Sequence, residues 1–223
     1  MRNFHLFDWH GARADYEKAL ALEPNNVPAL IGEALLLATI NQVRDGIATL
    51  RKVIAIDPMS VLALRQLAWL LMHDGQLPAA RAALNRLLEI DPQGDPYGRV
   101  MTLELLSGRP REALAASRNP SLIAGFRLVG VTLIEHTLGH DAESRQGLAE
   151  MISTGAQAWA YQIAEVYAWR GERNQACEWL ERAYRQGDGG LSYLTYDRFL
   201  VSLHSGQRYQ ALLRKLQLPA AQL

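Results

Sequence analysis

The sequence predicts an all-α protein, a right-handed α-solenoid of stacked antiparallel helix pairs, and three observations support this fold class. An acidic residue precedes proline at Glu23-Pro24, Asp57-Pro58 and Asp91-Pro92, so the three prolines follow one another at intervals of 34 residues. Each proline ends an apolar run with helical spacing. Polar residues that cap helices stand shortly after two of the prolines, at Asn26 and Ser60. Such a period is typical of two-helix repeats that bury their apolar faces by stacking on neighbours.

The prolines divide the first part of the chain into units. Residues 1–24 form a partial unit, in which Phe4 to Leu22 corresponds to the second helix of a pair. Residues 25–58 and 59–92 are complete units, and each ends at its proline because proline lacks the N–H that continues a helix. The helices expected in the complete units are Val27 to Ile40, Gly46 to Ile56, Leu62 to His73 and Pro78 to Ile90.

The later units follow the same plan with changes. Residues 93–120 form a degenerate unit, in which Asp95-Pro96 begins one helix and the early Asn119-Pro120 shortens the next. Residues 121–155, capped at Ser121, and 156–187 are further units. The run Gly187-Asp188-Gly189-Gly190 breaks the pattern. Residues 188–223 are expected to contain capping helices near Asp197 to Leu203 and Gln207 to Leu216, so the chain forms one solenoid domain, 1–223.

Composition excludes several classes of protein. Lys plus Arg equals Asp plus Glu at 23 each, so bulk charge does not favour direct binding to nucleic acid. Cys177 is the single cysteine, so neither an internal disulfide nor a cysteine metal cluster can form. No apolar run reaches the roughly 18 residues that span a bilayer, so no membrane insertion is expected. We expect a cytoplasmic protein, or a periplasmic one if an upstream membrane segment was removed. The first helix of the initial unit is either degenerate or missing, and in the second case the expectation is a fragment of a longer protein.

The units resemble the tetratricopeptide repeat (TPR), and the resemblance covers nearly the whole chain. That family has small residues at the eighth, twentieth and twenty-seventh positions of each unit and proline at the thirty-second. The corresponding residues are Ala12, Ala19 and Pro24; Ala34, Gly46, Val53 and Pro58; Ala68, Ala80, Leu87 and Pro92; and Ala164, Ala176 and Ala183. Small side chains are needed where two antiparallel helices approach closely. Val53 and Leu87 depart from the pattern, as do the lost prolines after position 120.

A second resemblance concerns the end of the chain. The segments 160–194 and 208–219 resemble the closing part of C-terminal TPR regulatory regions in bacterial signalling proteins, which include winged-helix activators, class III nucleotide cyclases and kinases. This resemblance implies the regulatory or scaffolding part of a larger bacterial signalling protein.

The TPR resemblance also implies a partner-binding groove, because the first helix of each unit lines the concave face in that family. The expected groove residues are Arg65, Trp69, His73, Thr102, Arg127, Glu135, Tyr161, Glu165 and Trp169. Aromatic and arginine side chains offer large contact area and charge-assisted hydrogen bonds. The alternative for Trp69 and Trp169 is packing between repeats. The Lys/Asn clamp for chaperone C-termini is missing, since its positions hold Ile31 with Leu35 and Arg65 with Trp69.

The remaining candidates give no catalytic, cofactor-binding or metal site. His136 and His140 have a spacing that can chelate a metal from one helix, with Glu135 as a third ligand, but Gly139 is expected to end the helix between them. Cys177 has no histidine nearby to activate it and is expected to pack. The sequence has no Ser-His-Asp order, P-loop or GxGxxG motif, so we do not expect an enzyme.

The leading prediction is therefore a non-catalytic protein–protein interaction module that binds a peptide or protein surface in its concave groove. Two alternatives stay open. One is self-association into a homodimer through the uncapped N-terminal end. The other is a small-ligand sensor in which Arg65, Arg127 and Tyr161 converge on an anionic molecule. The partner's identity does not follow from the sequence, because a fold does not determine a function.

Overall fold

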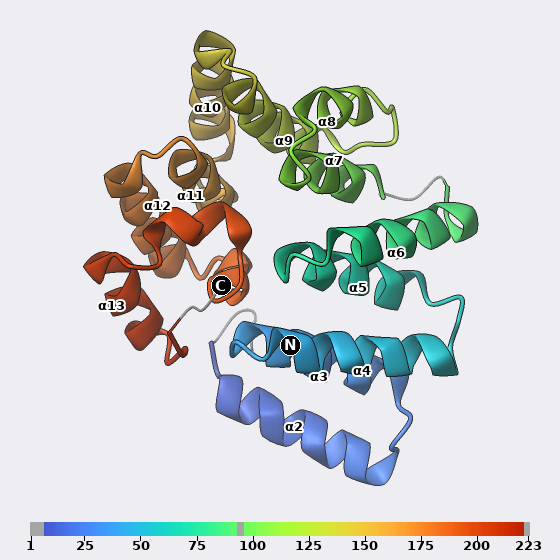
Figure 1. Cartoon of the computed structure of the whole chain (residues 1–223). Helices are drawn as coiled ribbons and strands as arrows, with labels where there is room; N and C mark the ends of the chain where they lie inside the picture. The colour runs from blue at the N-terminus through green and yellow to red at the C-terminus, as the bar shows by residue number, and fades with distance from the viewer. Residues whose placement is uncertain (1–6, 93–95, 221–223) are drawn as a thin grey trace.

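Antiparallel α-helices stack in pairs along a curved path (Figure 1). The computed structural model describes residues 7–92 and 96–220, and within these ranges the regular elements are all helical. The predicted all-α class with stacked antiparallel helix pairs is thereby confirmed. Two expectations, the start of the first helix at Phe4 and the cap at Asp95, lie outside the described residues.

The first half of the stack contains five helices of similar length. They are α2 (Trp9–Leu22), α3 (Val27–Thr39), α4 (Val43–Ile56), α5 (Val61–His73) and α6 (Leu77–Ile90). The expected caps form, since Asn26 Oδ1 accepts from the Ala29 N–H at 2.9 Å and Ser60 Oγ accepts from the Ala63 N–H at 3.4 Å. Both α4 and α6 end directly before an Asp-Pro pair, as the period predicts.

The second half of the stack is less regular. Its helices are α7 (Tyr97–Leu106), α8 (Pro110–Ala116), α9 (Ala124–Thr137), α10 (Asp141–Gly155), α11 (Ala160–Trp169) and α12 (Arg173–Gln186). The predicted shortening falls on α8, which has 7 residues. The expected cap at Ser121 is wrong: the Ser121 N–H donates to Asn119 Oδ1 at 2.9 Å in a turn around Pro120, and α9 begins three residues later.

Small residues let the helices of a pair approach closely. Ala34 of α3 and Gly46 of α4 are both buried, and a Cβ atom on Gly46 would lie 2.6 Å from the Ala34 carbonyl oxygen. Ala68 and Ala80 hold the matching positions in α5 and α6 and are fully buried. A larger side chain at these sites would force the two helices apart.

The last part of the chain turns into the interior of the curve. Gly187, with φ of +67°, ends α12 in the left-handed conformation that glycine adopts readily. The following residues 188–206, here called the C-terminal strap, contain the 3₁₀ helices η1 (Gly189–Tyr193) and η2 (Arg198–Leu203). Leu191, Leu194 and Leu200 of the strap are fully buried. The strap is therefore part of the apolar core.

Hydrogen bonds join the strap to three helices that are distant in sequence. The Thr195 hydroxyl lies 3.0 Å and 2.9 Å from the carbonyl oxygens of Ala38 and Thr39 at the end of α3. The Arg198 N–H donates to His73 Nδ1 of α5 at 3.1 Å, and Ser202 Oγ donates to the Ala168 carbonyl of α11 at 3.1 Å. The strap thus crosses the concave side of the stack.

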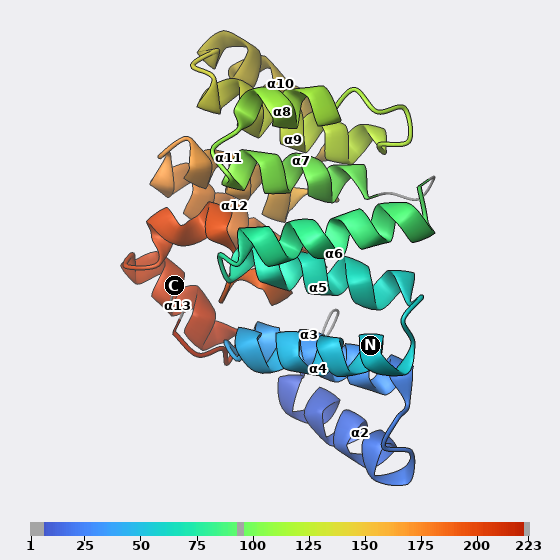
Figure 2. The same ribbon diagram turned by 45° about the vertical axis from the view of Figure 1, so that its right-hand side comes forward.

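The chain finally returns to its first described helix. Figure 2 shows α13 (Gln207–Lys215) beside α3 and α4, with α2 at one end of the stack and α10 at the opposite end. Trp9 of α2 donates its indole N–H to the Leu216 carbonyl at 2.6 Å, and both residues belong to one apolar cluster. The residue that follows α13 therefore contacts α2, while α13 itself packs on α12. None of the described helices has the length and apolar character to cross a membrane.

Candidate functional site

A buried polar cluster lies where the strap meets α5 and α11. Asp197 of the strap accepts a hydrogen bond from the Tyr161 hydroxyl at 2.8 Å and another from the Phe199 N–H at 2.9 Å. His73 Nδ1 lies 3.7 Å from Asp197 Oδ1, and Glu165 of α11 is the fourth member. The four side chains are almost completely buried. Because buried polar groups are costly unless they are paired, this cluster fixes the position of the strap.

The protonation of the cluster follows from its burial. Desolvation, followed by the Asp197 charge and a hydrogen bond with it, raises the pKa of Glu165 well above 4.5. Desolvation also lowers the pKa of His73 and raises that of Tyr161 well above its ordinary value. Each shift thus favours the uncharged form of its group: the carboxylic acid of Glu165, the neutral imidazole of His73 and the neutral phenol of Tyr161.

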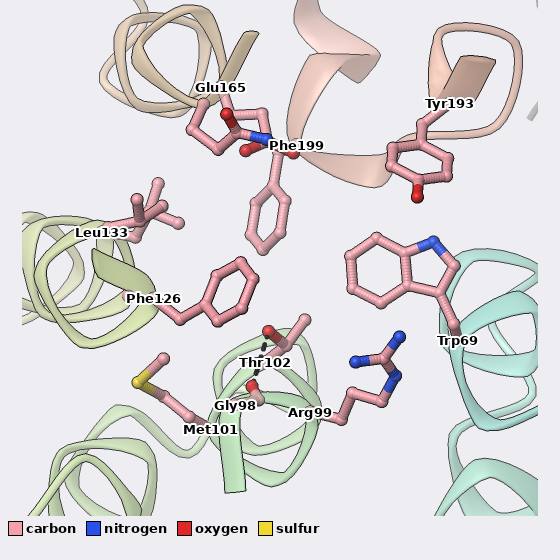
Figure 3. A pocket seen from close by; sticks show the side chains of 13 residues that line it. Trp69, Gly98, Arg99, Met101, Thr102, Phe126, Leu133, Glu165, Tyr193 and Phe199 are labelled. Carbon is pink, nitrogen blue, oxygen red and sulfur yellow. Dashed lines mark hydrogen bonds between the residues drawn. The ribbon is translucent and has the colours of Figure 1, made fainter. Parts of the chain in front are cut away.

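A cavity of about 190 Å³ opens beside this cluster and is here called the inner cavity (Figure 3). It lies between the first helices of successive pairs, α5, α7, α9 and α11, and the strap. The residues that line it are Trp69, Gly98, Arg99, Met101, Thr102, Phe126, Val129, Gly130, Leu133, Gln162, Glu165, Tyr193 and Phe199.

The inner cavity has an apolar floor and an exposed aromatic ring at its rim. Met101, Leu133 and Phe199 are buried at 5% exposure or less, whereas Phe126 is 54% exposed. Gly130 lets α9 approach α7, since a Cβ there would lie 1.9 Å from Met101 Cε. This arrangement suits an apolar group that enters past Phe126.

Arg99 of α7 supplies a positive charge to the wall of the inner cavity. Its Nε–H donates to the Arg65 carbonyl of α5 at 3.1 Å. Its guanidinium lies over the Trp69 ring, 5.5 Å from the centroid. These contacts hold the guanidinium beside the cavity, as Figure 3 shows. The stacking on Trp69 also adds a cation–π attraction.

The structure distributes the nine predicted groove residues over several environments. Trp69, Thr102 and Glu165 line the inner cavity. His73 and Tyr161 point to the same side but are fully buried by the strap. Arg65 does not line the inner cavity, but its main-chain carbonyl accepts the hydrogen bond from Arg99. Trp169 donates to Thr137 Oγ1 at 2.9 Å and packs its ring against Phe199, 5.3 Å between centroids.

Arg127 and Glu135 are engaged elsewhere. The Arg127 guanidinium donates to the carbonyl oxygens of Asn119 and Leu122, at 2.9 Å and 3.2 Å. Arg127 and Tyr161 therefore do not converge with Arg65 on one anion site. Glu135 is paired with His140, 2.6 Å between Oε2 and Nδ1.

The two histidines considered as metal ligands pair with different carboxylates. His136 Nδ1 lies 3.0 Å from Asp141 Oδ1, while His140 faces Glu135. Helix α9 ends before both His140 and Gly139, whose φ is +83°. Among residues 7–92 and 96–220, no three His, Cys, Asp or Glu side chains are grouped so that they could hold a metal ion. Burial raises the pKa of Cys177, which is unfavourable for a nucleophilic thiolate.

Several residues that line the inner cavity were not among the groove residues predicted from the sequence. Arg99 stands 34 residues after Arg65, so the repeat period contained the signal for it. Phe126 and Gln162 follow the degenerate unit, where the period is lost. Tyr193 and Phe199 belong to the strap, which has no repeat pattern to place it.

Comparison with known proteins agrees with this architecture. Residues 41–103 match the family model of the tetratricopeptide repeat. This range includes α5 and most of α7, which supply five of the residues around the cavity, Trp69, Gly98, Arg99, Met101 and Thr102. A search of curated proteins finds no match.

Solved structures show the same fold at low sequence identity. A tetratricopeptide repeat protein from Parabacteroides merdae matches 94% of this chain over 86% of its own length, with 15% identity and a TM-score of 0.52. A chain of the APC/C hetero-tetramer Cut9-Hcn1 matches 96% of this chain with 11% identity and a TM-score of 0.61, and this match spans 47% of that chain. YrrB, described as a TPR protein with an unusual peptide-binding site, matches 79% of this chain over 95% of its own, with 18% identity and a TM-score of 0.48. The two matches with TM-scores of 0.52 and 0.61 show that the chain has the fold of tetratricopeptide repeat solenoids.

Proposed function

We propose that this chain is a non-catalytic protein-interaction module that binds a peptide or an exposed segment of a partner protein at the inner cavity. The observation that carries the proposal is the combination of a buried apolar floor with the exposed ring of Phe126 at the rim. An apolar side chain of the partner enters the cavity and serves as the anchor, and Phe126 covers it.

The size of the inner cavity favours one side chain over a whole cofactor. A dry engineered cavity of about 150 Å³ holds a benzene molecule, so about 190 Å³ accommodates a phenyl ring or a branched aliphatic group. Pockets for drug-sized ligands usually measure about 300–1,000 Å³. A single anchoring residue therefore suits the space better than a cofactor does.

The strap determines where on the concave side a partner binds. It covers His73 and Tyr161 and contacts the end of α3, so this part of the concave side is already occupied by the chain itself. The accessible part lies between α5 and α11, where Trp69 and Phe126 are found. The tetratricopeptide match over α5 and most of α7 supports an interaction role for this part.

We further propose that the module regulates or scaffolds a larger, cytoplasmic bacterial signalling protein. The support is the resemblance of residues 160–194 and 208–219 to the closing part of such regulatory regions.

A peptide display experiment tests the binding function. A library of random internal peptides is panned on the immobilised chain, and selected peptides are measured by fluorescence anisotropy on the wild type, Phe126→Ala and Ile123→Ala. Ile123 is 56% exposed and precedes the same helix without lining the cavity, so it is the matched control. We expect Phe126→Ala to weaken binding about tenfold or more, as for an anchor contact, and Ile123→Ala to leave it unchanged. Equal binding to all three proteins would refute the proposal.

Self-association is a second candidate, and the observation that favours it is Leu22. This side chain is 81% exposed at the end of α2, on the first described helix of the stack. Sedimentation velocity over a range of concentrations tests it: a dimer that Leu22→Glu converts to a monomer would support self-association, and a concentration-independent monomer would exclude it.

A further inference from the structure

Helices α2, α4 and α6 all end on the same edge of the stack, as Figures 1 and 2 show. The helix ends and the turns after them (residues 18–26, 52–62 and 86–92) are here called the turn edge. At the 34-residue period the same three kinds of side chain recur on it. They are a basic residue at Lys18, Lys52 and Arg86, an apolar residue at Leu22, Ile56 and Ile90, and an acidic residue at Glu23, Asp57 and Asp91.

The recurrence arranges these side chains in three rows along the stack. In each helix the basic residue stands four positions before the apolar one, and residues four apart lie on the same face of an α-helix. The acidic residue follows directly, at the C-cap. Along each helix the order is therefore basic, apolar, acidic, so the apolar row runs between two rows of opposite charge.

The apolar row is exposed at the ends of α2 and α4. Leu22 and Ile56 are exposed, and so are Met59 in the next turn and Leu62 at the start of α5, with exposed fractions between 41% and 81%. These four are half of the eight large apolar side chains that are exposed among residues 7–92 and 96–220. An exposed apolar patch with polar residues at its margin is typical of a protein interaction site.

The charged residues of α2 and α4 border this apolar row. Lys18, Glu23 and Lys52 are exposed, and Asp57 is half-buried. The basic residue of α6 is engaged within the chain, because Arg86 donates to a main-chain carbonyl of the preceding unit at 2.7 Å. The accessible part of the turn edge therefore belongs to α2, α4 and the turn that follows α4.

A surface with this order of rows is complementary to a second copy of itself. In a two-fold dimer the same patch contacts itself, and an axis that runs along the rows reverses their order in the other copy. The basic row of each copy then faces the acidic row of the other, and the apolar rows meet at the centre. An axis across the rows would place basic residues on basic residues, and such like-charge contacts are unfavourable.

We propose that the turn edge is a homodimer interface, in which two copies of this chain lie edge to edge about a two-fold axis parallel to the rows. Across this axis Lys18 faces Glu23 and Lys52 faces Asp57, while Leu22, Ile56 and Met59 form the apolar centre. This inference rests on self-association, the second candidate function, and names its surface and orientation. The inner cavity takes no part in it.

Charge reversal in two complementary variants tests the orientation. The acidic variant carries Lys18→Glu and Lys52→Glu, and the basic variant carries Glu23→Lys and Asp57→Asn. Asparagine is chosen because Asp57 Oδ1 accepts a hydrogen bond from the Met59 N–H, and an amide oxygen can accept it too. Sedimentation velocity measures each variant alone and the two mixed in equal amounts, and thermal melting establishes that each is folded.

We expect the dissociation constant of the dimer to rise about tenfold or more for each variant alone, because like charges then face each other across the axis. The equal mixture should form a heterodimer, because acidic residues of one variant then face basic residues of the other. The control is Arg145→Glu with Arg173→Glu, at exposed positions of α10 and α12. It makes the same charge change as the acidic variant outside the turn edge and should leave the dimer intact.

The outcomes separate this inference from self-association itself. A wild-type dimer that Leu22→Glu disrupts but Met59→Glu leaves intact would show contact through the end of the stack and would overturn the turn edge. A mixture that stays monomeric, or a charge variant that dimerises as tightly as the wild type, would overturn the orientation and leave self-association standing. A wild type that is monomeric at every concentration would refute both and leave peptide binding at the inner cavity unaffected.

Discussion

Tyr161 donates its hydroxyl hydrogen to Asp197 across 2.8 Å, and this bond joins α11 to the strap in a fully buried interior. The two residues are 36 positions apart, and His73 of α5 and Glu165 of α11 lie around the same carboxylate. The strap is thus held on the concave side of the stack by polar contacts. Water cannot replace them, because these side chains are buried.

Replacing Tyr161 by Phe should lower the free energy of unfolding by about 1.5–3 kcal/mol, because a buried carboxylate loses one donor and the ring is kept. Urea denaturation measures the change. Tyr184→Phe is the control, since Tyr184 is 36% exposed, and we expect its effect to stay within about 0.5 kcal/mol. Equal effects of the two substitutions would show that the bond to Asp197 does not stabilise the fold.

Replacing Glu165 by Gln should change how stability depends on pH. The folded-state pKa of Glu165 is raised above 4.5. The contribution of Glu165 to the free energy of unfolding is therefore fully present below that pH and is lost as the pH rises through the folded-state pKa. As the pH rises from about 4.5 toward the folded-state pKa, the wild type should lose stability relative to the variant by up to about 1.4 kcal/mol per pH unit.

His73 has the opposite dependence. Its pKa is lowered from 6.5, so its contribution is present above that pH and is lost as the pH falls through the folded-state pKa. The wild type and Glu165→Gln both contain His73. The difference between their urea midpoints at each pH therefore gives the effect of Glu165 alone. Parallel curves for the two proteins would contradict the raised pKa.

Replacing Thr195 by Val should cost about 1–3 kcal/mol, because the hydroxyl bonded to the last carbonyls of α3 is removed and buried acceptors remain unpaired. Hydrogen exchange should become faster in the strap and at the end of α3. Thr154→Val on the exposed side of α10 removes a similar hydroxyl, and it should change the stability by less than about 0.5 kcal/mol. Unchanged exchange in the strap would argue against its anchoring at α3.

Replacing Trp9 by Phe removes the indole N–H that bonds to the Leu216 carbonyl. We expect a loss of about 1–3 kcal/mol and faster hydrogen exchange in both α2 and α13, since each helix then lacks the other's support. Trp179→Phe, in a partly buried ring of α12, should leave exchange in α2 unchanged. Faster exchange in α2 alone would show that the contact does not stabilise α13.

The sequence predicted the helices well because their signals are local. Asn26 and Ser60 cap helices through neighbouring N–H groups, and Asp57-Pro58 ends α4 whatever surrounds it. The predicted cap at Ser121 was wrong because Asn119 Oδ1 accepts a hydrogen bond from the Ser121 N–H, which forms a turn at this point instead of a helix start. Competing short-range hydrogen bonds of this kind are hard to rank without coordinates.

The site could be predicted only in part. Trp69, Thr102 and Glu165 line the cavity because the repeat period places them on the inner side of α5, α7 and α11. His73 and Tyr161 share that side but are covered by the strap, whose path depends on contacts such as Thr195 with α3. Those contacts join residues 156 and 157 positions apart, a separation at which no sequence period operates.

The contact between Trp9 and Leu216 also limits how this architecture can change. In an open repeat array each unit touches only its neighbours, so units can be gained or lost by duplication and unfolding can begin at either end. Here the first and last described helices share one apolar cluster, so an added or deleted unit would separate them. The number of units is therefore fixed by geometry, and the stack should unfold as one cooperative body.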